Sequence, residues 1–158
     1  MSVSEPVRKQ IVVAASRQRA FEVFTDRIDA WWPRSHHIGK SPLARAVLEA
    51  RVGGRWFSLC EDGSECDIGK VLEWEPPRRV LLAWQVNADW QYDPGFVTEV
   101  EVRFVELGPR ETRVELEHRN LDRYGVRESE VRNSIGSPGG WPGILQCYAD
   151  LVAAAEAP

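Results

Sequence analysis

An apolar stripe near the C-terminal end of the chain restricts the fold more than any other feature. From Trp141 onward, apolar side chains recur every three or four residues, which is the period of one helix face. The stripe consists of Trp141, Ile144, Leu145, Tyr148, Leu151, Val152 and Ala155. Pro142 suits the first turn of such a helix, where no backbone N–H is needed. A helix with this stripe must bury it, so the rest of the chain has to supply one large apolar surface.

That surface is predicted to be a curled antiparallel sheet. In residues 96–104 and 112–118, apolar or small side chains alternate with charged ones, and in residues 80–86 Val80, Leu82, Trp84 and Val86 alternate with Leu81, Ala83 and Gln85. Alternation with a period of two is typical of antiparallel strands that have one solvated face. The predicted strands cover residues 8–14, 47–52, 55–60, 65–75, 80–86, 96–104 and 112–118.

Two short helices are expected between the first two strands. Ser16 is predicted to cap the first helix, and Asp26 to cap the second, which ends before Pro33. A short, irregular helical segment is expected over residues 121–135. The order is one strand, two short helices, about six strands and a long helix, which indicates a single α+β domain over residues 1–158 with its core at 8–155.

Composition and charge exclude several classes of function. The formal net charge is −4 and the arginines are scattered among glutamates, which argues against nucleic-acid binding. No stretch approaches the roughly 20 apolar residues of a membrane span, and the first residues lack the features of a secretory signal. The three cysteines are an odd number, which favours a reducing, cytoplasmic location over a disulfide framework.

The tryptophans suggest where a ligand would bind. A strongly twisted sheet curls, and one helix laid along it does not fill the whole concavity, so a cavity between sheet and helix is expected. The residues predicted to wall it are Trp32, Trp56, Trp84, Trp141, Leu145 and Tyr148. The alternative for each of them is an ordinary place in the core. We therefore expect a small hydrophobic molecule as the partner.

The histidines allow two interpretations each. His118 falls on the inward phase of the last strand, where it is either a hydrogen-bonded structural group or a group that orients a ligand oxygen. His36 and His37 lie in a loop that either closes over the cavity mouth or has no special role. Adjacent loop residues rarely aim at one ion, so no metal site is predicted.

No catalytic residue and no cofactor are assigned from the sequence. Asp67, Glu73 and Glu99 are the carboxylates that a bulge would have to turn inward, and they are expected on the solvated face of the sheet. Cys147 lies off the main helix stripe without a histidine placed beside it, which favours a core cysteine over a nucleophile.

Several short motifs occur in an order that carries a family resemblance. The motifs are Ala20-Phe21-Glu22-Val23-Phe24-Thr25, Trp31-Trp32-Pro33, Val52-Gly53-Gly54-Arg55-Trp56, residues 69–80 with Trp84 beyond, Thr98-Glu99-Val100, residues 112–118 and Gly140-Trp141. In this order the chain resembles the START-like (SRPBCC) superfamily, and within it the AHSA-type branch named after the activator of the heat-shock protein 90 ATPase. The resemblance spans roughly residues 8–155 of the chain.

The resemblance implies a helix-grip (Bet v-like) fold with a deep cavity between the sheet and the long helix. Relatives across the superfamily bind lipids, hormones or polyketides, and a few carry out cyclisation or dehydration there. The chaperone-activating role belongs to larger members with an additional N-terminal domain, so the family name does not define the activity of this chain.

Three functions remain open at this point. The first is a protein that binds a small apolar or aromatic molecule, and we favour it over an enzyme. The second is a cyclase or dehydratase that uses His118 or a strand carboxylate as acid or base. The third is a chaperone-associated or stress-related interaction module, which would expose an apolar patch on the outer sheet face. The sequence leaves the oligomeric state open, with a homodimer among the alternatives.

Overall fold

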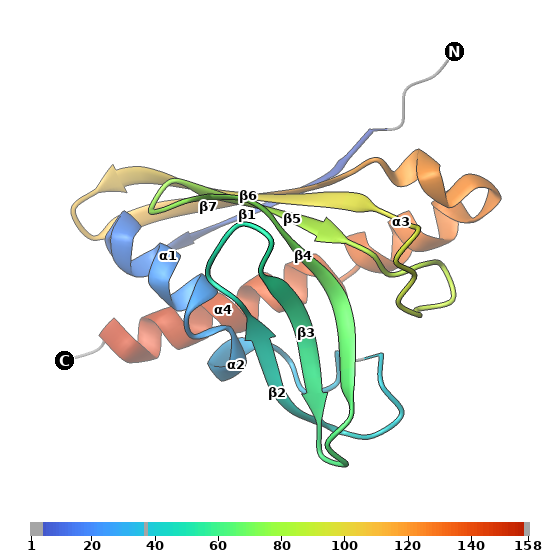
Figure 1. Cartoon of the computed structure of the whole chain (residues 1–158). Helices are drawn as coiled ribbons and strands as arrows, with labels where there is room; N and C mark the ends of the chain where they lie inside the picture. Colours follow the sequence, from blue (N-terminus) through green and yellow to red (C-terminus); the bar gives the residue numbers. More distant parts are fainter. Residues whose placement is uncertain (1–4, 37, 157–158) are drawn as a thin grey trace.

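The computed structural model describes residues 5–36 and 38–156, in which seven antiparallel strands form one sheet (Figure 1). The strands are β1 (Val7–Val13), β2 (Leu43–Leu48), β3 (Arg55–Cys60), β4 (Glu65–Glu75), β5 (Arg79–Trp84), β6 (Thr98–Gly108) and β7 (Glu111–Arg119). The helical segments are α1 (Arg17–Thr25), α2 (Ile28–Trp31), the 3₁₀ segment η1 (Leu121–Arg127), α3 (Glu128–Gly136) and α4 (Trp141–Glu156).

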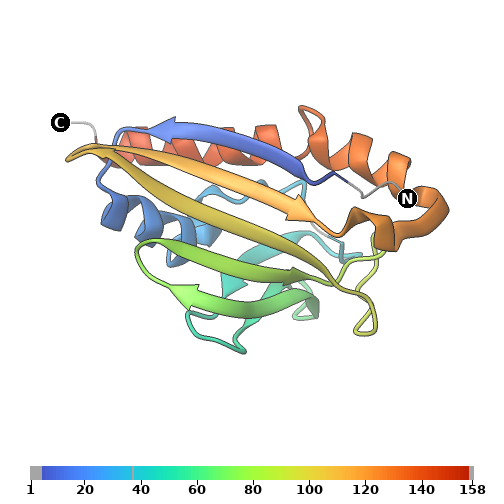
Figure 2. The ribbon, with the colours of Figure 1, turned by 90° about the horizontal axis from the view of Figure 1, so that it is seen from above.

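The sheet has the order β1-β7-β6-β5-β4-β3-β2 and curls around α4 (Figures 1 and 2). Register shifts in the β3–β4 and β4–β5 pairings accompany the curl. Gly69 lies between these shifts, and a Cβ there would come within 1.6 Å of the Ala83 carbonyl oxygen, so the close approach of β4 to β5 requires glycine. The predicted α+β helix-grip fold is confirmed. No helix in the described part of the chain is long and apolar enough to cross a membrane.

One of the two predicted helix caps is correct. The Ser16 hydroxyl accepts a hydrogen bond from the Arg19 N–H at 3.1 Å, as expected at the start of α1. Asp26 does not cap α2, because α1 continues to it: its backbone is helical (φ −66°, ψ −29°) and its N–H bonds to the Glu22 carbonyl. A residue in that conformation ends one helix and lacks the extended backbone of a cap for the next.

Aromatic side chains fill the middle of the concavity. Phe24 makes edge-to-face contacts with Phe104 on β6 and with Tyr148 on α4, at ring-centroid distances of 5.7 and 5.2 Å. The Tyr148 hydroxyl is fully buried and donates a hydrogen bond of 2.7 Å to the Ala20 carbonyl, which ties α4 to α1. Side chains therefore close the centre of the sheet–helix space, and any pocket has to lie toward an end of α4.

The outer face of the sheet carries a network of ion pairs centred on Glu101. Its carboxylate lies 2.7 Å from Arg79, 3.1 Å from Arg103 and 3.2 Å from Arg119, and these side chains leave it only 4% exposed. Burial raises the pKa of Glu101, but hydrogen bonds from Arg79 and Arg119 and the charge of Arg103 outweigh it, so the pKa lies below its ordinary value.

Replacing Glu101 with Gln should lower the free energy of unfolding by about 1–3 kcal/mol at pH 7, because charge-assisted hydrogen bonds are lost. Urea unfolding at several pH values measures the effect. A carboxylate whose pKa is lowered in the folded protein contributes its full stabilisation at pH values above its ordinary pKa of 4.5. This stabilisation is lost as the pH falls through the lowered pKa of the folded protein. The difference between the two proteins should therefore shrink in acid.

Glu115→Gln is the matched control, because Glu115 is half-buried on the same sheet face and forms its ion pair with Arg113. This variant should lower the free energy of unfolding by less than about 1 kcal/mol. Equal losses for the two variants would contradict the central place of Glu101 in the network.

Candidate functional site

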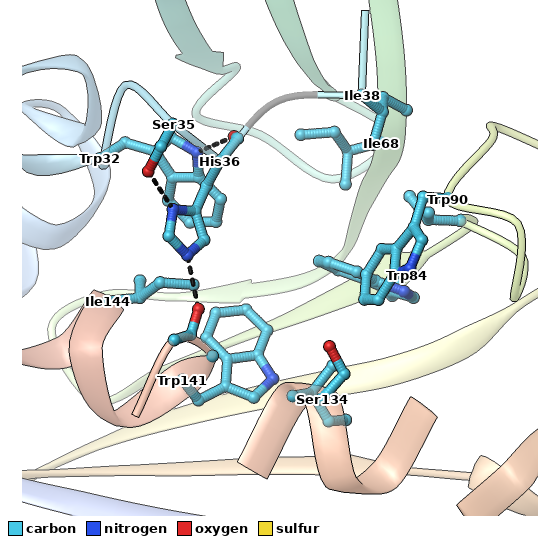
Figure 3. Close-up of a pocket in the computed structure, with 14 residues that line it drawn as sticks. Trp32, Ser35, His36, Ile38, Ile68, Trp84, Trp90, Ser134, Trp141 and Ile144 are labelled. Carbon is cyan, nitrogen blue, oxygen red and sulfur yellow. Dashed lines mark hydrogen bonds between the residues drawn. The ribbon is translucent and has the colours of Figure 1, made fainter. Parts of the chain in front are cut away.

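A pocket of about 250 Å³ lies beside the N-terminal end of α4 (Figure 3). Its walls come from the α2–β2 loop, β4, the end of β5, the β5–β6 loop, the end of α3 and the first turn of α4. The lining residues are Trp32, Ser35, His36, Ile38, Ile68, Trp84, Val86, Trp90, Ser134, Ile135, Gly139, Gly140, Trp141 and Ile144. The pocket therefore brings together four stretches that are far apart in the sequence, namely residues 32–38, 68, 84–90 and 134–144.

Three of the predicted cavity residues, Trp32, Trp84 and Trp141, line this pocket. Trp141 makes edge-to-face contacts with the other two, at ring-centroid distances of 6.4 Å to Trp32 and 5.8 Å to Trp84. They come from the end of α2, from β5 and from the start of α4, so the wall forms only when the sheet has curled around the helix.

The indole N–H of each of these tryptophans has a partner within the protein. Trp32 donates to the His36 carbonyl at 2.8 Å, Trp84 to the Tyr124 hydroxyl at 3.0 Å, and Trp141 to His118 Nδ1 at 3.1 Å. Such bonds fix the orientation of these three rings and engage their N–H groups within the protein. The three indoles therefore present apolar aromatic surface to the pocket.

The other four predicted residues are buried and do not line the pocket. Trp56 packs behind the wall, with ring centroids 6.0 Å from Trp32 and 5.7 Å from Trp84. Leu145 and Tyr148 belong to the filled centre of the concavity, and His118 lies behind Trp141. The structure thus separates a wall of three tryptophans from four residues that support it.

His118 is the polar anchor behind the wall. Its Nδ1 accepts from Trp141, so the neutral ring carries its hydrogen on Nε2, which lies 2.8 Å from the Thr98 hydroxyl. Complete burial lowers the pKa of His118 from 6.5 to about 3. His118 is therefore a neutral structural group at physiological pH, and it lies outside the pocket.

His36 is the ionisable side chain of the pocket wall. Its Nε2 lies 2.6 Å from the Gly139 carbonyl oxygen, which only accepts, so Nε2 carries a hydrogen. Its Nδ1 lies 3.0 Å from the Ser35 hydroxyl. Both ring nitrogens of His36 therefore have a hydrogen-bond partner in the pocket wall. The cavity-edge interpretation of His36 thus has a structural basis, whereas His37 lies outside the described residues.

A tight turn between α3 and α4 completes the pocket. A Cβ at Gly140 would come within 2.2 Å of the Ile135 carbonyl oxygen, so this approach of the two helices requires glycine. The turn sets Ser134 and Ile135 beside Trp141 at the pocket edge.

The structure shows no metal-binding group among the residues that it describes: none has three His, Cys, Asp or Glu side chains together. Asp67, Glu73 and Glu99 do not line the pocket, and each pairs with an arginine instead, with Arg55, Arg79 and Arg119 respectively. In the described residues, the polar side chains that line the pocket are therefore those of Ser35, His36 and Ser134.

The sequence analysis missed several pocket residues. Ile38, Ile68, Val86 and Ser134 carry no pattern that separates a pocket wall from core or surface. Trp90 could have been noticed, because it stands in a sharp turn, where a large aromatic residue is unusual.

Replacing His118 with Gln should change how stability depends on pH. The pKa of His118 is about 3 in the folded protein and has its ordinary value of 6.5 in the unfolded chain. Between pH 6.5 and pH 3, only the unfolded chain protonates this histidine, so the free energy of unfolding falls as the pH falls through this range. Between pH 8 and 5.5, urea unfolding of the wild type should lose about 1.4 kcal/mol more than that of His118→Gln.

Equal losses over this pH range would show that His118 is not held neutral. At pH 8 the variant should also be about 1–3 kcal/mol less stable, because one buried hydrogen-bonding partner of Trp141 or Thr98 is lost. A variant as stable as the wild type at pH 8 would show that the His118 hydrogen bonds do not stabilise the fold.

Comparison with known proteins identifies the family. The solved structure of the anthrahydroquino-gamma-pyrone synthase Txn09 is 39% identical over 96% of this chain and 99% of that chain, with a TM-score of 0.66. The solution structure of CalC, a self-sacrificing resistance protein from Micromonospora echinospora, is 33% identical over 97% of both chains, with a TM-score of 0.73. No curated protein matches the chain. The family model described as "Activator of Hsp90 ATPase homolog 1-like protein" matches residues 14–153, so the chain belongs to this family within the helix-grip (SRPBCC) fold.

Proposed function

We propose that this protein binds a small, planar, largely apolar aromatic molecule in the pocket beside α4. The observation that carries the proposal is the wall of Trp32, Trp84 and Trp141, whose N–H groups all bond within the protein. Aromatic rings attract one another in stacked and edge-to-face arrangements, so such a wall favours an aromatic ligand over an aliphatic one.

The volume of the pocket suits one or two fused rings. An apolar cavity of about 150 Å³ binds benzene, and pockets for drug-sized ligands start near 300 Å³. At about 250 Å³ the pocket lies between these values. Ser35, His36 and Ser134 would supply the few polar contacts that orient a hydroxyl or carbonyl group of the ligand.

The relatives support the same ligand class. The name of the 39% identical relative describes a synthase of an anthrahydroquino-gamma-pyrone, which is a compound with fused rings.

The outer sheet face carries ion pairs around Glu101 where an interaction module would need an apolar patch. We therefore favour small-molecule binding over an interaction with a chaperone. We also propose a cytoplasmic location, where the cysteines would stay reduced.

Binding of 2-naphthol, a two-ring probe, tests the proposal. Titration should quench tryptophan fluorescence to saturation, and native mass spectrometry should show one bound probe. Ser134→Trp places an indole at the edge of the pocket and should weaken binding at least tenfold. Asn133→Trp is the matched control, because Asn133 is the exposed neighbour on α3 and does not line the pocket.

Two outcomes would contradict the proposal. The wild type would show no saturable binding of the probe, or the two tryptophan variants would bind it equally well. Mass spectrometry of protein purified from cells extends the test, since a bound mass that is lost on denaturation would identify the natural ligand.

A second candidate is an enzyme of the cyclase or dehydratase kind that uses the same pocket. The observation that favours it is the Ser35–His36 pair, which lines the pocket with a hydroxyl and an imidazole, the side chain that most often acts as a general acid or base. The 39% identical relative is a synthase, which supports the same candidate. His36 replaces His118 as the acid or base of this candidate, because His118 lies behind the wall.

Ring opening of 5-nitrobenzisoxazole measures such a base directly. A base takes the C3 proton of this planar bicycle, the N–O bond breaks, and a coloured cyanophenolate is released. The wild type should accelerate the reaction over buffer, and His36→Gln should abolish the acceleration. Asp150→Asn should keep it and provides the control, because Asp150 is an exposed residue of α4 that does not line the pocket. An acceleration that survives His36→Gln would exclude His36 as the base.

A further inference from the structure

Two hairpin turns of this protein have the same backbone design. In the β3–β4 turn, Cys60 N–H bonds to the Ser64 carbonyl at 2.8 Å, and Gly63 N–H bonds to the Cys60 carbonyl at 2.9 Å. In the β5–β6 loop, the N–H of Asn87 bonds to the Gln91 carbonyl at 2.9 Å, and that of Trp90 to the Asn87 carbonyl at 3.0 Å. Both are three-residue turns whose last residue has a positive φ.

The two turns differ at that last residue. The first turn has Gly63 with φ +86°, and the second has Trp90 with φ +60°. This left-handed backbone favours glycine, because the Cβ of any other residue comes too close to the following carbonyl. The chain therefore places its bulkiest side chain where its own other turn has glycine. Strain of this kind, observed at a pocket, points to a function of the side chain.

The Trp90 ring lies at the mouth of the pocket. It lines the pocket on the side opposite His36, as Figure 3 shows, and 41% of its surface is exposed. An ion pair between Arg127 and Asp89 holds its loop against η1, and the Asn87 side chain accepts hydrogen bonds from the N–H groups of Asp89 and Gln91. These contacts fix the backbone of the turn and hold the loop beside η1.

We propose that Trp90 is a ligand-binding residue that selects planar ligands long enough to extend from the buried tryptophans to the mouth. Two fused rings fit beside Trp32, Trp84 and Trp141, whereas a third ring would reach Trp90 and stack on it. This inference rests on the proposed function and extends its ligand class from two-ring molecules held inside the pocket to planar systems whose third ring lies at the mouth.

Thermal unfolding without ligand tests the backbone part of the inference. Trp90→Gly and Trp90→Ala both remove the ring, but only alanine keeps the unfavourable φ. Trp90→Gly should therefore melt about 2–4 °C above Trp90→Ala, the reverse of the order at an ordinary position. Gly63→Ala is the matched control, because nothing lies within 4 Å of a Cβ built there. It should lower the melting temperature by a similar amount.

Binding of two probes tests the ligand part. The probes are 2-naphthol, with two rings, and 1,8-dihydroxyanthraquinone, with three. Trp90→Gly should weaken binding of the three-ring probe about tenfold and binding of 2-naphthol by a clearly smaller factor. Trp90→Phe should restore part of the loss. Tyr92→Ala is the control, because Tyr92 is a similarly exposed aromatic residue of the same loop that does not line the pocket.

The outcomes separate this inference from the proposed function. If neither probe binds the wild type, the proposed function is overturned. If both bind and Trp90→Gly binds the three-ring probe as tightly as the wild type, Trp90 is not a ligand-binding residue and the inference alone is overturned. If Trp90→Ala melts at or above Trp90→Gly, the turn does not store the strain on which the inference depends.

Discussion

The hydrogen bond from Trp141 to His118 is the interaction on which the pocket depends. It joins the first residue of α4 to β7, and the other ring nitrogen of His118 continues the connection to Thr98 on β6. The helix therefore begins at a fixed place on the sheet, and a tryptophan ring faces the space in front of it. Because the imidazole is buried and neutral, the connection holds without the cost of a buried charge.

A second buried polar connection fixes the neighbouring wall. The Tyr124 hydroxyl donates to the Val86 carbonyl at 2.8 Å and accepts from the Trp84 indole. Burial raises the pKa of Tyr124 to about 12, so the hydroxyl keeps the hydrogen that this bond needs. The two connections have the same consequence: the polar edges of the indoles point into the protein, and their apolar faces remain for the pocket.

The sequence predicted the architecture because periodicity reports burial. The stripe on 141–155 and the alternation on 96–118 gave the long helix, the sheet and its inner face correctly. The same periodicity does not distinguish a pocket wall from the core behind it, since both are buried. Trp84 and Tyr148 both face inward, yet Trp84 lines the pocket and Tyr148 fills the centre of the concavity. Which of them is open to a ligand depends on packing between distant segments, above all on where α1 and α2 lie.

The pocket mouth follows different rules from the wall. The wall residues satisfy every local preference, with inward phase, buried rings and bonded N–H groups. At the mouth, Trp90 has a positive φ, a backbone conformation that favours glycine. The equivalent position of the β3–β4 turn has glycine, Gly63. A residue that opposes local preference lowers the stability of the fold, so selection for stability alone would remove it. The proposed contact of the Trp90 ring with a ligand accounts for a tryptophan at this position, and the ion pair between Arg127 and Asp89 ties its loop to η1.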